Sequence, residues 1–342
     1  MRHSCRLTFL CLVISVFDLL SIVIPIYNAA AILHKLYDRL TAASPSWKED
    51  YEIILVDDGS YDASLGIMKA FAEKDPHFKI VKLSRNFGHQ AAISAGLKVT
   101  RGEAVVIMDG DLQDPPEQLP IFLEKWREGF DVVYAIRTKR KEGFFKKLAY
   151  KVFYRLLAWI SDIDIPLDSG DFCVMDRRVA EVMLQEMPEQ NRFVRGLRAF
   201  AGFNQVGVAY EREERAGGEA KYTFRKLLNL ALDGLFDFST FPLKLAIYIG
   251  LFVSFTSFLV GIFFIFHRIF NFKILGYSPT DTPGLATLAV GIFFLSGVIL
   301  IFLGVIGEYI GRMYLEVKRR PFFIIEEIVS HDPPSESQPT DH

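Results

Sequence analysis

Two acidic residues, Asp109 and Asp111, are separated by one residue at the end of an apolar stretch of the sequence. Two carboxylates at this spacing can hold a divalent cation, and such a cation can in turn bind the phosphates of a substrate. An ordinary acidic turn is the competing interpretation, because Asp and Gly are common turn residues. The acidic pair alone fits both a cation site and an ordinary turn. The strands and helices around it distinguish the two interpretations.

The stretch before the pair, residues 104–108, is apolar without alternation. Such a run predicts a strand covered on both faces, as in a parallel sheet under helices. Similar apolar runs lie at 19–25, 51–56 and 79–84. Stretches in which apolar residues recur at helical spacing lie between these runs. This alternation predicts an α/β fold with a doubly wound sheet. Because ligands bind outside the carboxyl ends of such strands, Asp57, after the second run, should meet Asp109 at one edge.

The overall composition excludes several classes of protein. The chain has 342 residues, of which 51% are hydrophobic, so it can bury a large core and is too apolar to be disordered. Its 39 basic and 41 acidic residues give a net charge of -2, which argues against a nucleic-acid partner. Cys5, Cys11 and Cys173 lack metal-ligand spacing and indicate a reducing compartment without disulfides.

Residues 1–19 form an apolar N-terminal extension. Its apolar part, 7–17, follows Arg2 and Arg6 and resembles the start of a signal peptide. No small-residue cleavage site follows, and the run is short for a bilayer span. We therefore favour an overlong assigned start or an arm that touches the membrane, with a signal peptide as the alternative.

Two long apolar runs, 243–266 and 285–310, could each span a bilayer as a helix. Basic residues flank the pair on both outer sides, so the positive-inside rule predicts a multi-pass protein of the inner (plasma) membrane with both termini cytoplasmic. Two buried core helices are the alternative. The predicted divisions are the extension at 1–19, a cytoplasmic sheet domain at 20–222, an interfacial juxtamembrane helix at 223–242, a two-helix transmembrane region at 243–310 and a cytoplasmic tail at 311–342.

Three basic segments could contact phosphate or membrane. Residues 144–160 mix basic and aromatic side chains in a helical pattern, which suits either a core-packed helix or an anionic membrane surface. A second segment repeats arginine at helical spacing, which suits either a solvated face or a phosphate site. A third places two cations around a glycine turn that could close over a polyphosphate. The cations of the last two segments are Arg192, Arg195 and Arg198, and then Arg215 and Lys221.

Five short motifs occur together in this sequence, at 21–28 (SIVIPIYN), 56–60 (VDDGS), 84–90 (SRNFGHQ), 108–116 (MDGDLQDPP) and 307–312 (GEYIGR). With these motifs, in this order, the chain resembles the family 2 glycosyltransferases over about residues 21–326. Within that family it is similar to the polyprenyl-phosphate glycosyltransferases related to dolichol-phosphate mannose synthase. The two C-terminal apolar runs resemble the bacterial branch typified by bactoprenol glucosyltransferase and the undecaprenyl-phosphate aminoarabinose transferase. Residues 164–172 (DIPLDSGDF) are more similar to the former.

The resemblance implies a fold and a reaction. The fold is the nucleotide-diphospho-sugar transferase (GT-A-like) sheet, followed by interfacial helices and two transmembrane helices. The reaction is a metal-dependent, inverting transfer of a hexose, glucose from UDP-glucose in the first instance, to undecaprenyl phosphate at the cytoplasmic membrane face. The product would be a lipid-linked sugar for cell-envelope glycan modification, and the enzyme a homo-oligomer.

Three alternatives stay open beside this reaction. The same fold could use another sugar, such as mannose or aminoarabinose. A processive polysaccharide synthase should carry a Gln-x-x-Arg-Trp motif and more membrane spans, and the sequence shows neither. A non-catalytic membrane scaffold could also retain the fold.

The same resemblance assigns roles to individual residues. Pro25, Tyr27 and Asp57 would surround the base and ribose of the nucleotide, and Asp109, Gly110 and Asp111 its diphosphate. Mg²⁺ or Mn²⁺ would be held by Asp109, Asp111 and Gln113. Arg137, Arg215 and Lys221 would clamp phosphates, and Arg192, Arg195 and Arg198 would bind the acceptor phosphate. The catalytic residues would be Asp111, Arg137 and Asp171, the last in a positioning or general-base role.

Two positions depart from the family pattern. Ala29 stands where many relatives have Glu, and Ala220 stands where Ser or Thr usually precedes Lys-Tyr. The first departure changes the nucleotide contacts, and the second removes a hydroxyl beside Lys221 without removing the cation.

Overall fold

The computed structural model describes residues 19–137, 169–189, 192–211, 241–270 and 284–331. Several predicted features lie outside these ranges: the extension at 1–18, the basic helix at 144–160, the loop that carries Arg215 and Lys221, and most of the interfacial segment at 223–242.

Eight strands form one mixed sheet in the order β7-β5-β6-β4-β1-β2-β3-β8. Strands β3, β2, β1 and β4 are parallel to one another, and they form the predicted doubly wound core. The sheet as a whole is not parallel, however, because β6 lies antiparallel between β4 and β5, and β8 lies antiparallel to β3. The strands are β1 (Leu20–Ile26), β2 (Tyr51–Asp57), β3 (Phe78–Leu83), β4 (Ala104–Ile107), β5 (Val132–Arg137), β6 (Ser169–Asp176), β7 (Gln205–Tyr210) and β8 (Ile325–Val329).

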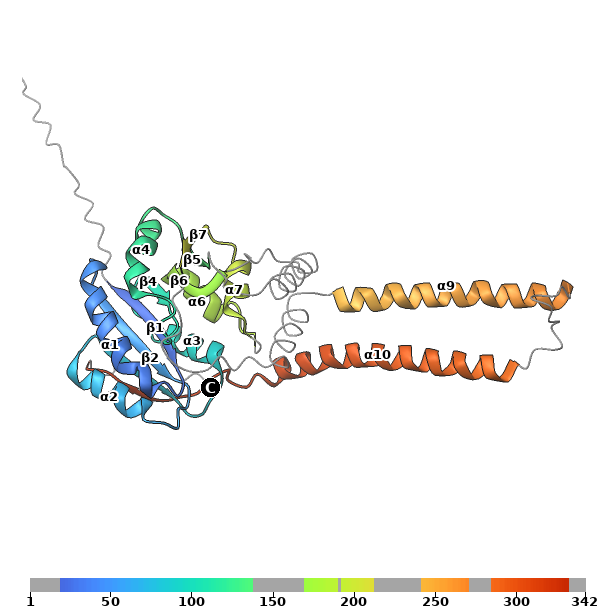
Figure 1. Cartoon of the computed structure of the whole chain (residues 1–342), viewed down its shortest axis with the longest axis horizontal. Coiled ribbons are helices and arrows are strands. Elements are labelled where there is room, and N and C mark those ends of the chain that lie inside the picture. The colour runs from blue at the N-terminus through green and yellow to red at the C-terminus, as the bar shows by residue number, and fades with distance from the viewer. Residues whose placement is uncertain (1–18, 138–168, 190–191, 212–240, 271–283, 332–342) are drawn as a thin grey trace, which may run out of the picture.

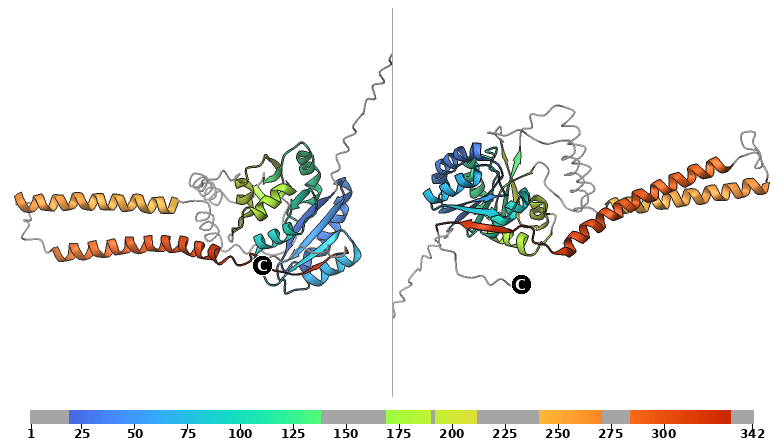
Figure 2. Two further views of the ribbon diagram at one scale, coloured as in Figure 1. Left: turned by 180° about the vertical axis from the view of Figure 1, so that it is seen from behind. Right: turned by 90° about the horizontal axis from the view of Figure 1, so that it is seen from below.

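Helices cover both faces of the sheet, and each face has its own apolar core (Figures 1 and 2). One face packs against α1 (Ala30–Ala43), α2 (Ser64–Lys74) and α4 (Leu119–Arg127). The other face packs against α3 (His89–Lys98), α6 (Arg177–Gln185) and α7 (Val194–Phe200). This double cover explains why β1, β2 and β4 are mostly apolar without alternation, since side chains on both faces leave water.

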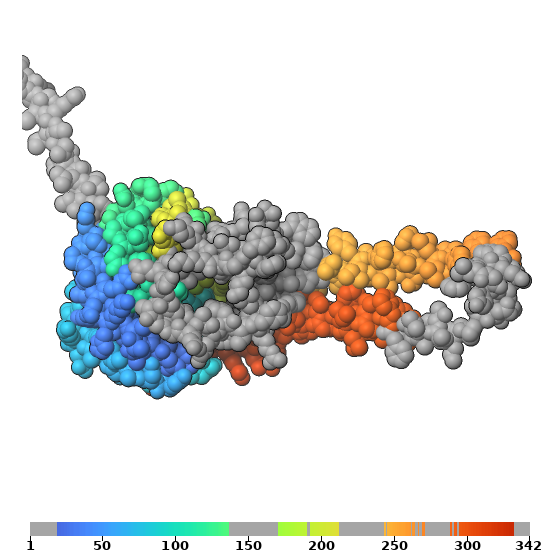
Figure 3. Space-filling view, in the orientation of Figure 1, coloured from blue at the N-terminus to red at the C-terminus, as the bar shows by residue number. Residues whose placement is uncertain are grey.

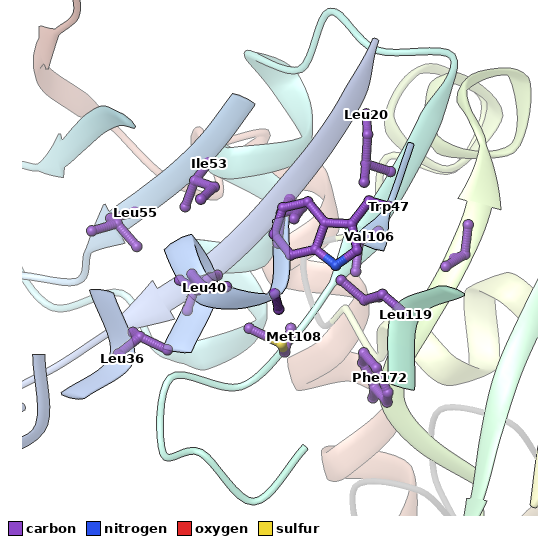
Figure 4. Packing of buried hydrophobic residues seen from close by; sticks show 14 of the residues in the cluster. Leu20, Leu36, Leu40, Trp47, Ile53, Leu55, Val106, Met108, Leu119 and Phe172 are labelled. Carbon is purple, nitrogen blue, oxygen red and sulfur yellow. The ribbon is translucent and has the colours of Figure 1, made fainter. Parts of the chain in front are cut away.

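The core on the α1 face supports the segment that carries the acidic pair (Figure 4). Met108, directly before Asp109, is fully buried in this core with Trp47 and Val106. The Trp47 indole Nε1 donates a hydrogen bond to the Pro116 carbonyl at 3.4 Å. The residues on either side of the acidic pair are therefore anchored in the core.

Two long helices, α9 (Phe241–Phe270) and α10 (Gly284–Lys318), run side by side as an antiparallel hairpin away from the sheet domain (Figures 1–3). Many of their large apolar side chains are exposed, including Phe252 at 71% and Leu300 at 67%. Exposed apolar surface on this scale indicates a membrane or protein partner.

Among the described residues, one helical stretch, 294–318, is apolar and long enough to cross a membrane, with a mean hydropathy of 2.0. A shorter apolar stretch, 245–260, lies in α9. The predicted pair of transmembrane helices is thus supported for α10 and stays a prediction for α9.

The segment predicted as a cytoplasmic tail contributes to the fold. Helix α10 continues to Lys318, and β8 then pairs with β3 at the edge of the sheet. Lys69 Nζ lies 2.7 Å from Glu327 Oε2, and Lys82 Nζ lies 2.7 Å from Glu326 Oε1. The chain therefore returns from the helical hairpin to the sheet domain and closes its β3 edge.

Candidate active site

The carboxyl ends of the parallel strands bring the predicted acidic residues to one edge. Asp57 is the last residue of β2, and Asp109 follows the end of β4 by two residues. Strand β1 lies between β2 and β4, so the two acidic positions are separated by two strand spacings, about 10 Å. Pro25 and Tyr27, at the end of β1, lie between them in the sheet order.

The loops after β1 and β2 are bonded to each other. The Asn28 N–H donates to Ser60 Oγ at 3.0 Å, and the Tyr61 N–H donates to Asn28 Oδ1 at 3.0 Å. Asn28 adopts a left-handed φ of 49°, which Asn tolerates better than most residues. These bonds hold Tyr27, 48% exposed, beside Tyr61, 84% exposed, with their ring centroids 6.1 Å apart in an edge-on arrangement.

Asp57 presents a buried acceptor at this edge. Its Oδ1 accepts the Ser60 N–H at 3.2 Å, whereas its buried Oδ2 has no hydrogen-bond partner among the described residues. Burial raises the pKa of Asp57, against the hydrogen bonds from Ser60. A buried carboxylate oxygen without a donor is costly, so a ligand N–H or O–H at this position would be favourable.

The turn that carries Asp109 and Asp111 is tightly constrained. A Cβ on Gly110 would lie 2.6 Å from Ile26 Cδ1, so this position packs against the end of β1. Leu112 is buried at a left-handed φ of 61°, which is uncommon for a Leu and is a conformation that concentrates at functional sites. Asp111 Oδ1 accepts the Gln113 N–H at 3.1 Å. The turn thus holds the three predicted metal-binding positions together.

Negative charge accumulates around Asp109. Burial raises the pKa of Asp109 to about 6; His89 opposes the rise, while Asp171, Asp114 and Asp111 add to it. A bound cation would relieve this repulsion. Among the described residues, no group of three or more His, Cys, Asp or Glu side chains forms a metal cage. Two carboxylates and an amide suit Mg²⁺ or Mn²⁺ that completes its shell with substrate phosphates, so the donor set fits such an ion.

Asp171, on β6, is held by a cation. Arg195 Nε donates to Asp171 Oδ1 at 2.7 Å, and Arg195 Nη2 donates to Asp171 Oδ2 at 3.2 Å. Burial by itself would raise the pKa of Asp171, but Arg195 and His89 outweigh burial and hold it well below its usual range. So acidic a carboxyl group is a weak proton acceptor, which favours a positioning role for Asp171 over a general-base role.

The three arginines predicted for the acceptor phosphate have different surroundings. Arg192 is buried, and its guanidinium donates to the carbonyls of Met183, the residue two before the end of α6, and Met187, two residues after it. Arg198 is 1% exposed and lies over the Tyr134 ring. Only Arg195 of the three pairs with a predicted catalytic residue. The contacts of Arg192 and Arg198 favour a structural role, and the phosphate prediction is retained for Arg195.

The remaining predicted cations are not tested by the described contacts. Arg137 is the last residue of β5 and pairs in register with Tyr210 of β7, while its side chain lies outside the described part of the structure. Arg215 and Lys221 lie outside the described residues altogether.

Three further side chains lie at this edge, those of His89, Asp58 and Asp114, and none of them was predicted as a site residue from the sequence. His89 Nε2 lies 3.5 Å from Asp109 Oδ1 and 3.5 Å from Asp171 Oδ2. Asp58 accepts the N–H groups of Phe87 and Gly88, before α3. Asp114 accepts a hydrogen bond from the Tyr210 hydroxyl. His89 and Asp58 belong to the motifs at 84–90 and 56–60, which was the available signal.

Comparison with known proteins agrees with this architecture. Residues 21–184 match the family model described as glycosyl transferase family 2. YkcC of Bacillus subtilis, an uncharacterised glycosyltransferase, is 47% identical over 308 residues, which cover 90% of this chain and 93% of that protein. The bactoprenol glucosyl transferase of Shigella phage SfII is 40% identical over 310 residues, covering 90% and 97% of the two chains.

Solved structures align less closely. The mannosyl-3-phosphoglycerate synthase of Rubrobacter xylanophilus aligns with a TM-score of 0.42 and 21% identity, covering 64% of this chain and 71% of that chain. The sequence relatives therefore carry the assignment of the chain to a family.

Proposed function

Because the chain belongs to glycosyl transferase family 2, we propose that it transfers a hexose from a sugar nucleotide to a polyprenyl phosphate. The proposed donor is UDP-glucose and the proposed acceptor is undecaprenyl phosphate. The name of the phage SfII relative, a bactoprenol glucosyl transferase, supports a glucosyl group and a bactoprenol acceptor, and UDP as the nucleotide follows from the family resemblance. The product, a lipid-linked sugar, would serve cell-envelope glycan modification.

One observation carries the proposal: the constrained turn at 109–113 gathers Asp109, Asp111 and Gln113 at the carboxyl edge of the sheet, across β1 from the buried Asp57. In this arrangement the nucleotide would lie over the ends of β1 and β2 and its diphosphate at the end of β4. The open Oδ2 of Asp57 could accept a hydrogen bond from the base or ribose. The exposed rings of Tyr27 and Tyr61 supply aromatic surface for the base.

Asp109, Asp111 and Gln113 would hold Mg²⁺ or Mn²⁺. The ion would neutralise the diphosphate as it leaves, which is electrostatic stabilisation of a developing charge. Asp111 is half-buried, so its carboxylate could also contact the diphosphate. The family resemblance implies that Arg137, Arg215 and Lys221 would bind the phosphates of the leaving group and stabilise their negative charge.

The acceptor phosphate needs positioning more than activation. A phosphate monoester is already largely ionised near neutral pH, so it can attack the anomeric carbon without a strong general base. The low pKa of Asp171 agrees with this mechanism, because a weak base suffices. Arg195 would orient the phosphate, and a single displacement would invert the anomeric configuration.

The apolar helix α10 supports a membrane location for the acceptor. Its stretch at 294–318 could cross a bilayer, and the following residues, Arg319 and Arg320, are basic. From this helix and the positive-inside rule we propose that the sheet domain and both termini lie on the cytoplasmic side of the inner membrane. The family resemblance supports the further proposal of a multi-pass, homo-oligomeric protein.

A donor screen tests the choice of sugar. Purified protein in detergent is heated with each common sugar nucleotide, with and without Mg²⁺, because a ligand that binds the folded state raises the apparent stability. UDP-glucose should give the largest metal-dependent rise. A larger rise with GDP-mannose or UDP-aminoarabinose would move the proposal to that sugar. Binding without any transfer to undecaprenyl phosphate would favour the scaffold alternative.

A further inference from the structure

Strands β4 and β6 bring two carboxylates, those of Asp109 and Asp171, to the same end of an antiparallel pair. Their antiparallel register pairs Ile107 with Cys173, and continuing it by two residues places Asp109 opposite Asp171. Like charges at directly opposite positions of an antiparallel pair repel each other and destabilise the pairing. The structure therefore needs a donor between these two side chains if both are to stay ionised and close.

His89 occupies that position. Its Nε2 lies 3.5 Å from Asp109 Oδ1 and 3.5 Å from Asp171 Oδ2, so the imidazole is within ion-pair distance of both carboxylates. Asp171 is held from its other side by the two hydrogen bonds of Arg195. The result is a continuous line of side chains from α7 through β6 and α3 to the acidic turn after β4.

The backbone that carries His89 is itself fixed. His89 is the first residue of α3, and the preceding Gly88 adopts a φ of 100°, a conformation that favours glycine. The Asp58 carboxylate accepts the Phe87 N–H at 2.7 Å and the Gly88 N–H at 3.0 Å. The loop after β2 thus sets the start of α3, and α3 sets the imidazole.

We propose that His89 is a positioning residue that bridges Asp109 and Asp171 and fixes the separation between the metal-diphosphate side and the acceptor side of the active site. This inference rests on the proposed function. His89 acts through the two carboxylates and makes no bond to the transferred sugar. Reacting groups held about 1 Å out of place can lose about 100-fold in rate, so a bridge at this point has a large effect on turnover.

Two substitutions separate the bridging donor from other roles of the ring. His89→Gln keeps an N–H group near the place of Nε2, whereas His89→Ala removes it. We expect His89→Ala to lower kcat at least about tenfold with a smaller change in KM for the donor, and His89→Gln to stay within about threefold of the wild type. Equal loss in both variants would assign the imidazole a proton-transfer role and overturn the proposal, as would wild-type kcat in His89→Ala.

A second readout does not depend on transfer. Titration calorimetry measures the affinity of UDP in the presence of Mn²⁺, and we expect His89→Ala to weaken it about five- to tenfold. In an Asp171→Asn background the opposing charge is gone, so the same substitution should change the affinity by less than about twofold. An undiminished effect of His89→Ala in that background would contradict bridging. If the wild type binds UDP and Mn²⁺ but transfers no sugar, the proposed function fails while this comparison still decides the role of His89.

His77→Ala is the matched control. His77 Nδ1 lies 2.7 Å from Asp75 Oδ1, so it forms a histidine–carboxylate pair of the same kind, before β3 and away from the acidic turn. We expect its kcat and its affinity for UDP with Mn²⁺ to equal those of the wild type. A loss in His77→Ala similar to that in His89→Ala would show that the measured effects are changes in stability and would overturn the positioning role.

Discussion

The Arg195 guanidinium donates two hydrogen bonds to the Asp171 carboxylate, from Nε to Oδ1 at 2.7 Å and from Nη2 to Oδ2 at 3.2 Å. The Asp171 side chain is 7% exposed and that of Arg195 28% exposed. Arg195 was predicted to bind the acceptor phosphate, and Asp171 was predicted to be catalytic, so this ion pair links two predicted site residues. It connects helix α7 to strand β6 across the α3 face of the sheet.

Breaking this pair should destabilise the fold. Arg195→Gln leaves the Asp171 carboxylate buried without its cation, and we expect a loss of about 2–3 kcal/mol in the free energy of unfolding at pH 7. The double variant Arg195→Gln/Asp171→Asn should recover most of that loss, because it removes the unpaired charge. Urea unfolding in detergent measures both. The control, Arg178→Gln, breaks an exposed pair with Asp131 and should change stability by less than about 1 kcal/mol. Equal losses in the Arg195 and Arg178 variants would contradict the structural importance of the Asp171 pair.

Glu52 should make stability depend on pH at the opposite edge of the sheet. This carboxylate is buried and accepts hydrogen bonds from Ser21 Oγ at 2.6 Å and the Arg101 N–H at 2.8 Å, and Lys79 Nζ lies 3.0 Å away. Burial opposes ionisation, but Ser21, Lys79 and Arg101 outweigh it and lower the pKa of Glu52. The stabilisation is therefore present above the unfolded pKa of about 4.5 and is lost as pH falls through the lower folded value.

Glu52→Gln tests this linkage. We expect it to cost about 2–3 kcal/mol at pH 7, because the Lys79 and Arg101 cations lose their buried partner, and the difference from the wild type should narrow as pH falls below about 4.5. Thermal unfolding between pH 7 and pH 3.5 follows the difference. Glu128→Gln, in an exposed pair with Lys125, is the control and should show little change at either pH. A difference that stays constant or widens toward low pH would contradict the sign of the Glu52 linkage.

Glycine substitutions should separate a constrained turn from an open helix position. Gly59 adopts a φ of 68°, and a Cβ there would lie 2.5 Å from the Asn86 backbone nitrogen. Gly59→Ala should therefore cost about 2–3 kcal/mol and weaken nucleotide binding. Gly66, in α2, has nothing within 4 Å of such a Cβ, and Gly66→Ala should gain about 0.5–1 kcal/mol. Melting temperatures of the two variants provide the comparison. A stable Gly59→Ala protein would show that the loops after β2 and β3 are not packed as described.

The pairing of β8 with β3 should be visible in hydrogen exchange. Truncation after Arg320 removes β8, so amides of β3 at the new sheet edge should exchange at least about tenfold faster. Amides of β4, in the middle of the sheet, serve as the internal control and should keep their protection. Unchanged protection of β3 would mean that the C-terminal segment does not cover this edge in solution.

The sequence predicted the parts of the fold that depend on local patterns. Strands β1–β4 begin and end within a few residues of the apolar runs that predicted them, because burial on the faces of a sheet imposes those patterns directly. The edge shared by Asp57 and Asp109 followed from the parallel order of these strands.

The features that the sequence did not predict depend on contacts between distant segments. Nothing local shows that β6 enters the sheet antiparallel beside β4, or that β8, with its exposed Glu326 and Glu327, closes the β3 edge. The spacing of Arg192, Arg195 and Arg198 predicted one shared face, yet Arg192 precedes α7 and binds carbonyls at the end of α6. The proposed role of His89 likewise depends on tertiary contacts, because β4 and β6 place the carboxylates of Asp109 and Asp171 beside it.

The most direct test of the proposed function is transfer of labelled glucose from UDP-glucose to undecaprenyl phosphate by the purified protein with Mg²⁺. Asp111→Asn is measured beside it, together with Asp50→Asn as an exposed control near the opposite edge of the sheet. We predict a labelled lipid of inverted anomeric configuration from the wild type and the control, and a rate at least about 100-fold lower from Asp111→Asn with its fold intact. Undiminished transfer by Asp111→Asn would contradict the role of Asp111. No lipid product from the wild type with any common sugar nucleotide would contradict the proposed function.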